Sequence, residues 1–219
     1  MGHFDKATFA FLSELKRNNE RAWFNSNKDR FEEDVKQPFL DFISDAGPIL
    51  RKISKNLVAD ARPVGGSLFR IYRDTRFSKD KSPYKTHAGA HFQLGDKGVH
   101  GPGYYLHLDP AQSFVGGGLW MPEAKALQMI REHIAGEPAE WRKVRSKLDH
   151  GEHALKRPPR GFDPDHPMIE DIKRKSFTAS VRLTQKQVTA DDFMRTFAGA
   201  CAQIAPLMKF LANAVGVGW

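Results

Sequence analysis

The segment 70–85 concentrates positive charge beside two tyrosines and only two carboxylates. Its cations are Arg70, Arg73, Arg76, Lys79, Lys81 and Lys85, and its carboxylates are Asp74 and Asp80. A guanidinium group is a planar fork that binds carboxylate or phosphate through paired hydrogen bonds. The segment therefore predicts either a site for an anionic ligand or an internal network of salt bridges.

The position of each arginine on a strand separates these two interpretations. In an extended strand, Arg73 shares a face with Phe69 and Ile71 and is carried toward apolar surroundings. A buried guanidinium needs a partner, and we expect Asp74 or a distant carboxylate to provide it. Arg73 would then be structural, whereas Arg76, beyond the end of the strand, would face a ligand.

A turn expected over 82–86 would bring two more side chains, Tyr84 and Lys85, over the same pocket. The ligand predicted for this pocket is a small molecule that carries a phosphate or a carboxylate. The predicted ligand-binding residues are Arg70, Arg73, Arg76, Lys81, Tyr84 and Lys85. The sequence indicates no particular cofactor, and it leaves open whether the protein is an enzyme.

Three residues are candidates for proton transfer, should a reaction take place. His87 stands next to the basic segment, and the ordinary pKa of histidine lies close to neutrality. Asp74 lies within the segment itself. His166 follows Asp165, so the two form either an acid/base pair or a simple turn that Asp165 caps.

A cluster of imidazoles is expected on one face of a sheet. His87 and His91 share a face of one predicted strand, and Tyr105, His107 and Asp109 share a face of the next. If these strands pair, three imidazoles and a carboxylate meet, and such groups suit zinc or iron. The spacing matches no metalloenzyme signature, so we predict no metal and interpret the cluster as the solvated face of a sheet.

The overall charge widens the set of expected partners. The chain of 219 residues has a formal net charge of +8, which favours anionic partners and makes nucleic acid the alternative to a small ligand. A second basic stretch supports that alternative: Arg142, Lys143, Arg145, Lys147, Lys156, Arg157 and Arg160.

The sequence contains no run of about 18 apolar residues, so it predicts no membrane span. The single cysteine, Cys201, excludes an internal disulfide and fits a cytoplasmic location.

The hydrophobic pattern predicts helices, then strands, then helices. This order is typical of an α+β fold with an antiparallel sheet, formed by roughly 68–120 plus a strand near 176–183, and packed with N-terminal, middle and C-terminal helices. Residues 68–73 are the first expected strand, and 113–120 is expected to be broken by its glycines. We expect one domain over 1–219. Prolines at 38, 48 and 206 should kink their helices, and Thr189 with Asp192 should start the last one.

The arginine segment also resembles a known family. The pattern Arg-x-x-Arg-Asp-x-Arg-Phe, followed by an acid or amide, lysine and tyrosine, is similar to the hallmark of the family called domain of unknown function 2461. It is formed here by Arg70, Arg73, Asp74, Arg76, Phe77, Asp80, Lys81 and Tyr84. The resemblance extends through nearly the whole chain. It implies no activity, so no catalytic residue is carried over from it.

Three roles follow from these patterns. The first is binding of a phosphate-bearing or carboxylate small ligand through 70–85. The second is that of an accessory protein that binds nucleic acid without sequence preference. The third is a structural or adaptor role in which the arginines only form internal salt bridges. One basic pocket would favour the first role, a continuous basic stripe the second, and fully paired arginines the third.

Overall fold

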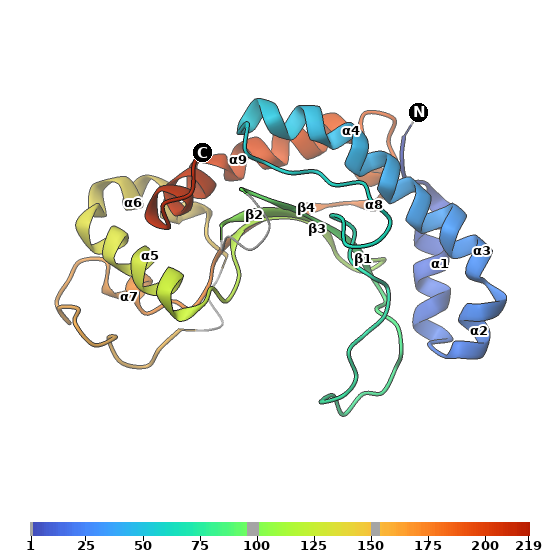
Figure 1. Cartoon of the computed structure of the whole chain (residues 1–219), viewed down its shortest axis with the longest axis horizontal. Helices are drawn as coiled ribbons and strands as arrows, with labels where there is room; N and C mark the ends of the chain where they lie inside the picture. The colour runs from blue at the N-terminus through green and yellow to red at the C-terminus, as the bar shows by residue number, and fades with distance from the viewer. Residues whose placement is uncertain (1, 96–100, 150–153) are drawn as a thin grey trace.

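A four-stranded antiparallel sheet forms the centre of the fold, in the order β1-β2-β3-β4. We describe the protein from a computed structural model, which defines residues 2–95, 101–149 and 154–219. Figure 1 shows the sheet between groups of helices, so the expected α+β fold is confirmed. The strands are β1 (Ala88–Gln93), β2 (Gly103–Leu108), β3 (Ser113–Leu119) and β4 (Phe177–Leu183).

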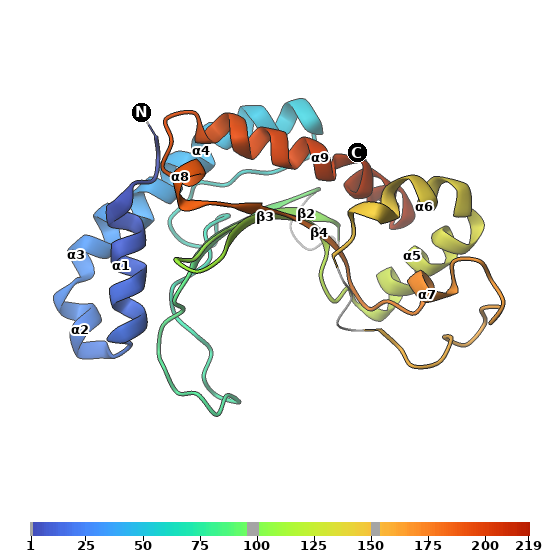
Figure 2. The ribbon, with the colours of Figure 1, turned by 180° about the vertical axis from the view of Figure 1, so that it is seen from behind.

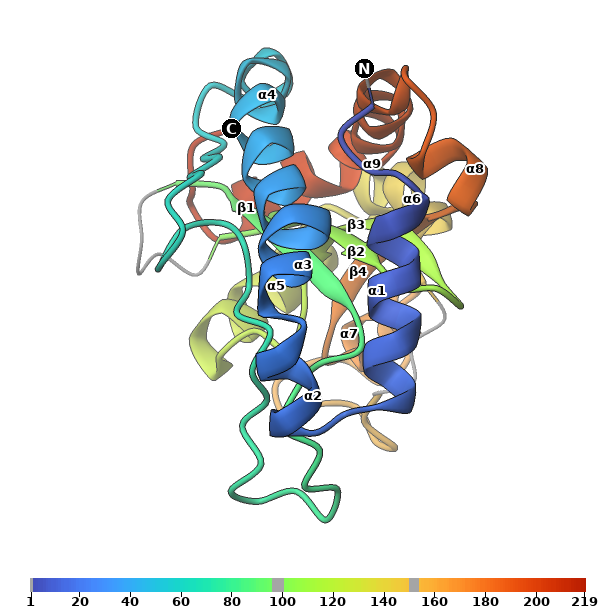
Figure 3. The same ribbon diagram turned by 90° about the vertical axis from the view of Figure 1, so that its right-hand side faces the viewer.

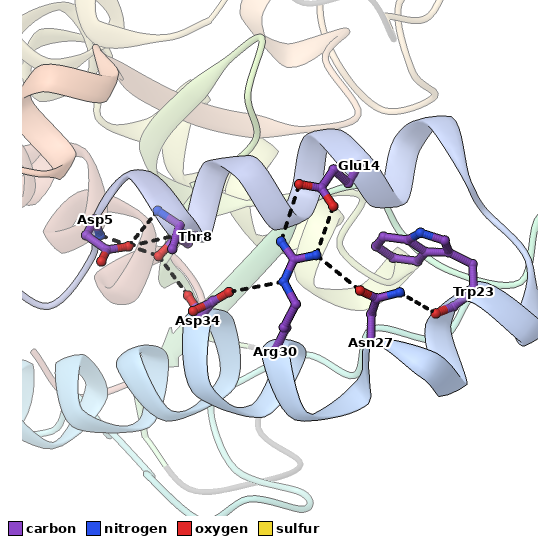
Figure 4. A network of polar contacts seen from close by, with 8 residues as sticks. Asp5, Thr8, Glu14, Trp23, Asn27, Arg30 and Asp34 are labelled. Carbon is purple, nitrogen blue, oxygen red and sulfur yellow. Dashed lines mark hydrogen bonds and ion pairs between the residues drawn. The ribbon is translucent and has the colours of Figure 1, made fainter.

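The N-terminal helices form one wall of the molecule. Asp5 caps the first of them, since its carboxylate accepts from the backbone N–H groups of Ala7 and Thr8. Arg30 then joins this helix to the next ones, and Figure 4 shows its guanidinium between Glu14, Asn27 and Asp34. The elements are α1 (Lys6–Arg17), α2 (Arg21–Ser26), α3 (Lys28–Phe31), the π-helical η1 (Glu32–Lys36) and α4 (Gln37–Ile53).

One face of the sheet is covered by α4 and by α9 (Phe193–Ala214), as Figures 1 and 2 show from opposite sides. Strand residues that point toward these helices are apolar and buried, for example Phe92 and Leu106. The hydroxyl of Tyr104 donates to the carbonyl of Cys201 in α9. Pro48 and Pro206, where kinks were expected, both lie inside helices that continue through them. Packing of the apolar helix faces against the sheet offsets the hydrogen bond that each proline removes.

The start of the last helix also differs from the prediction. Thr184, and not Thr189, forms a capping box, with Gln187 as its partner. This cap opens the short helix α8 (Gln185–Val188), and α9 begins after Asp192 without a side-chain cap. The remaining helices pack beyond the other end of the strands (Figure 1). They are α5 (Ala124–Gly136), α6 (Pro138–Val144), the 3-10 turn η2 (Arg145–Lys147) and α7 (Ile169–Ile172).

The predicted strand at 68–73 does not form. Leu68 makes an isolated bridge with Ala90 at the edge of the sheet, and Tyr72 makes another with Tyr84. Residues 70–85, which we call the basic arm, therefore leave the sheet edge and double back on themselves. Figure 3 shows this segment projecting beyond the sheet on the side away from α4. In the described part of the chain, no helix combines the length and apolar character needed to cross a lipid bilayer.

Candidate functional site

A cleft of about 660 Å³ lies on the face of the sheet that α4 and α9 leave uncovered. Every second residue of a strand points to the same face of the sheet, so the side chains that line the cleft alternate along each strand with side chains on the covered face. The main contributors are His91, Tyr105, Phe114, Thr178 and Ser180 from the sheet, with Phe69, Trp120 and Asp149 around them. The volume is in the range usual for small-molecule sites.

Aromatic rings form a continuous floor across three strands. The Tyr105 ring centroid lies 5.7 Å from that of His107 and 5.9 Å from that of Phe114, and the His107 and Phe114 rings stack at 4.8 Å. Phe69 extends this floor at the edge, 5.8 Å from Tyr105. Planar ligands stack favourably on such surfaces. We call this set, with His87 and His91, the aromatic floor.

Glycines on the same face allow two of these rings to lie against the sheet. A Cβ atom at Gly89 would lie 2.4 Å from the hydroxyl of Tyr105, and one at Gly103 would lie 2.2 Å from Nε2 of His91. The next strand was expected to break at its glycines, but β3 continues through them to Leu119. Gly118 in that strand has φ 132°, a conformation that L side chains rarely adopt. The sheet therefore uses glycine to make a flat floor.

The sheet brings together the histidines that the sequence placed on one face. Strand pairing sets His107 opposite Gly89, and the rings of His87 and His107 lie 4.4 Å apart. Burial, helped by the neighbouring His87, lowers the pKa of His107 to about 4. Burial also lowers the pKa of His87, with a further contribution from Lys85. Both imidazoles are therefore neutral near pH 7 and can accept a proton or a hydrogen bond.

Tyr105 and His107 share a hydrogen bond of 3.0 Å between the phenol oxygen and Nδ1. Burial raises the pKa of Tyr105 to about 12, so its hydroxyl keeps its proton. Asp109 does not complete a metal site, since its carboxylate accepts from the backbone of Ala111 in the turn that follows β2. Within residues 2–95, 101–149 and 154–219, no three His, Cys, Asp or Glu side chains are grouped so that they could share a metal ion.

The basic arm is held to the body of the protein at its base. Its two sides are joined by backbone hydrogen bonds from Arg73 to Pro83 and from Lys85 to Ile71. The ring of Tyr84 is buried and stacks on Phe24 at 4.1 Å between centroids. Tyr84, predicted as a ligand-binding residue, thus anchors the arm with its ring.

The arginines of the arm pair differently from the prediction. Arg73 donates across the arm to Asp80, whereas Asp74 accepts from Arg76 in a local turn. Of the two partners expected for Arg73, Asp74 is taken by Arg76, and the carboxylate that Arg73 uses is Asp80 on the other side of the arm. Ser82 and Arg73 hold the pKa of Asp80 well below its usual range. Lys81 donates to the carbonyl of Thr75, so it closes the tip of the arm.

Two cations at the base of the arm, Arg70 and Lys85, have no carboxylate partner among the described residues. Nζ of Lys85 donates to the carbonyl of Arg70 at 2.9 Å and lies 5.4 Å from the ring centroid of Phe69. Burial and the charge of Arg70 lower the pKa of Lys85. Among the described residues, neither Lys85 nor Arg70 forms a salt bridge. Two adjacent, unneutralised cations beside a cleft are suited to bind an anion.

Two candidates for proton transfer lie away from this cleft. His166 accepts at Nδ1 from the backbone of Met168 and approaches the carbonyl of Ala135 with Nε2. Both of its ring nitrogens thus have structural partners, and its turn is capped by Asp163 instead of Asp165. Asp74 lies in the arm, paired with Arg76. Only His87 of the three lies at the aromatic floor.

Trp120 forms part of the wall of the cleft. Trp120 is 66% exposed at the end of β3, and Met121 after it has φ 44°. The backbone N–H of Met121 donates to the hydroxyl of Ser176, which holds this strained turn.

In the second basic stretch, Arg145 forms a salt bridge with the buried carboxylate of Asp171.

Comparison with known proteins adds a family assignment. Residues 7–210 match the family model described as a conserved hypothetical protein, domain of unknown function 2461. This match covers nearly the whole chain and confirms the resemblance noted in the sequence. A search of curated proteins found no match.

Proposed function

The chain belongs to the domain of unknown function 2461 family, and we propose that it binds a small molecule with a planar ring and a phosphate group in the sheet cleft. The ring stacks on the aromatic floor, and the phosphate lies at the base of the basic arm. The observation that carries this proposal is the position of Lys85. Its ammonium group is partly buried beside Phe69 and Arg70 with no carboxylate partner among the described residues.

Electrostatics supports an anion at this place. Burial of a cation is unfavourable unless a counter-charge compensates for the lost hydration. The charge of Arg70 adds to this cost, because it lowers the pKa of Lys85 further. A phosphate between the two cations would remove the repulsion and form charge-assisted hydrogen bonds, which contribute about 1.5–3 kcal/mol each. A carboxylate ligand would use the same groups with less charge.

The floor supports a planar ring next to that phosphate. Phe69 contacts both parts of the site, since its ring lies near Lys85 and near Tyr105. Neutral His87 and His107 add hydrogen-bonding groups without extra charge. A nucleoside monophosphate combines these features and is a suitable probe. The proposed compartment is the cytoplasm, which agrees with the free thiol of buried Cys201.

Titration calorimetry with four probes tests the proposal: adenosine monophosphate, adenosine, ribose 5-phosphate and inorganic phosphate. We expect the nucleotide to bind more tightly than any probe that lacks its ring or its phosphate. Lys85→Ala and Arg70→Ala should each weaken nucleotide binding by about tenfold or more. Phe69→Ala should weaken binding of adenosine and of the nucleotide but leave that of inorganic phosphate unchanged.

The matched control is Lys209→Ala, which removes the same charge from the exposed side of α9, on the covered face of the sheet. We expect this variant to bind all four probes as the parent does. The proposal is wrong if no probe binds, or if Lys209→Ala weakens nucleotide binding as much as Lys85→Ala.

A further inference from the structure

The tip of the basic arm presents a large apolar side chain to solvent. Phe77 is 95% exposed, more than any other large hydrophobic residue of the described chain. The guanidinium carbon of Arg76 lies 5.8 Å from the centroid of its ring. One exposed phenylalanine is not unusual by itself. Its position, at the end of an arm whose base borders the aromatic floor, requires an explanation.

The arm tip is built from its own hydrogen bonds. Asp74 accepts from the backbone and the guanidinium of Arg76, and Asp80 accepts from the backbone and hydroxyl of Ser82. Lys81 closes the tip through the carbonyl of Thr75. The arm is therefore a shaped element that holds Phe77 away from the body, and not a segment that merely lacks packing partners.

The same bonds leave the arm with an excess of positive charge. Both of its carboxylates are paired inside the arm, with Arg73 and with Arg76. The other cations have no carboxylate partner among the described residues: Arg70, Lys79, Lys81 and Lys85. Arg70 and Lys85 lie at the base of the arm, where Lys85 donates to the Arg70 carbonyl next to Phe69, and Lys81 lies near the tip, where it donates to the Thr75 carbonyl. The arm thus has cations both at its base, beside the exposed ring of Phe69, and near its tip, which presents Phe77.

We propose that the arm and the cleft together bind a single-stranded segment of nucleic acid. One base stacks on the aromatic floor, the sugar-phosphate chain follows the cations of the arm, and a later base stacks on Phe77. This inference rests on the proposed function, since the cleft holds one nucleotide of the strand. Proteins that bind single strands without sequence preference combine a basic track with aromatic platforms in this way.

Length and chemistry favour a strand over the other anionic partners. Phe77 follows Phe69 by eight positions, so their Cα atoms lie at most about 29 Å apart, a span that a strand of several nucleotides can cover. A duplex keeps its bases stacked inside and has none to offer to Phe77. A membrane surface usually needs a wider apolar face or a second anchor, whereas the tip offers one ring.

Fluorescence anisotropy with labelled twelve-nucleotide oligothymidylate and oligouridylate tests this inference. We expect both strands to bind more tightly than a labelled mononucleotide, with affinity that falls as salt rises from 50 to 200 mM. Phe77→Ala should weaken binding of the strands by about five- to a hundredfold and leave mononucleotide binding unchanged. Phe77→Trp should restore strand binding. Val64→Ala, at another exposed apolar residue outside the arm, should have no effect.

The outcomes separate this inference from the proposed function. If the protein binds a mononucleotide as tightly as it binds the strands, the inference is overturned and the proposed function stays intact. Absence of any nucleotide or strand binding overturns both. The inference also fails if strand binding is the same in Phe77→Ala, if a duplex binds as tightly as the single strands, or if vesicles of anionic lipid bind through Phe77 while the strands do not.

Discussion

The side-chain amide of Asn19 pairs with both backbone groups of Tyr84, although 65 residues separate them. The amide nitrogen donates to the Tyr84 carbonyl at 3.0 Å, and the amide oxygen accepts from the Tyr84 N–H at 3.0 Å. This arrangement copies the pairing of a neighbouring strand. It ties the basic arm to the turn between α1 and α2, at the point where the Tyr84 ring stacks on Phe24.

We expect Asn19→Ala to release the arm from the N-terminal helices. Loss of two partly buried hydrogen bonds should lower the free energy of unfolding by about 1–3 kcal/mol. Hydrogen exchange at the Tyr84 amide should accelerate more than exchange in the sheet. Asn18→Ala is the matched control, because Asn18 makes one exposed bond to the Glu14 carbonyl and should cost at most about 1 kcal/mol. Equal exchange at Tyr84 in both variants would contradict this account.

The depressed pKa of His107 makes stability depend on pH in a defined window. The folded protein binds a proton on His107 only below about pH 4, whereas the unfolded chain binds it below about pH 6.5. The unfolded state therefore holds more protons between these values, and the free energy of unfolding falls as pH decreases from 6.5 to 4. We expect His107 to account for about 2 kcal/mol of this loss, measured by urea unfolding at several pH values.

His107→Asn is the control for that window, since the amide can still bond to Tyr105 but does not titrate. In this variant the free energy of unfolding should change less steeply with pH between pH 4 and 6.5. The paired carboxylates of Glu14, Asp74 and Asp80 have lowered pKa values, so their contributions are lost as pH falls below about 5, at the lower end of this window and beneath it. An unchanged slope in His107→Asn would show that His107 titrates normally.

Gly118→Ala should disturb the pairing of β3 with β4. The substituted residue would have to adopt φ 132°, and its Cβ atom would lie 2.0 Å from the carbonyl oxygen of Phe177. We expect a loss of at least about 1–3 kcal/mol in the free energy of unfolding, from backbone strain alone. Gly199→Ala provides the opposite result, because open space surrounds this helical position and alanine should stabilise by about 0.5–1 kcal/mol. Thermal unfolding of the two variants checks both signs.

Arg73 and Arg76 should differ in how they affect the arm. The Arg73 side chain is 28% exposed and joins the two sides of the arm through Asp80, whereas Arg76 is 77% exposed and pairs with Asp74 only two residues away. We expect Arg73→Ala to speed hydrogen exchange over 72–86, and Arg76→Ala to leave it near the parent rate. Exchange followed by mass spectrometry measures this. Faster exchange in Arg76→Ala than in Arg73→Ala would reverse the assignment.

Hydrophobic periodicity alone determined the α+β class, the strand near 176–183 and the shared face of the histidines. Alternation along a strand depends only on local backbone geometry, so His87, His91 and His107 could be placed together once their strands were expected to pair. The family suggested by the arginine motif is likewise the one that the family model matches. The physical reason is that these features follow from spacings of a few residues.

Only the tertiary structure decided which side chains form the site. The Asn19–Tyr84 pair, the contribution of Trp120 and the choice of Asp80 as partner of Arg73 depend on contacts between segments whose approach no local pattern encodes. Helices α4 and α9 continue through Pro48 and Pro206, because tertiary packing outweighs the local cost of proline. The charge of Lys85 could be read from the sequence, but its burial beside Phe69 and Arg70 arises from the folded arm.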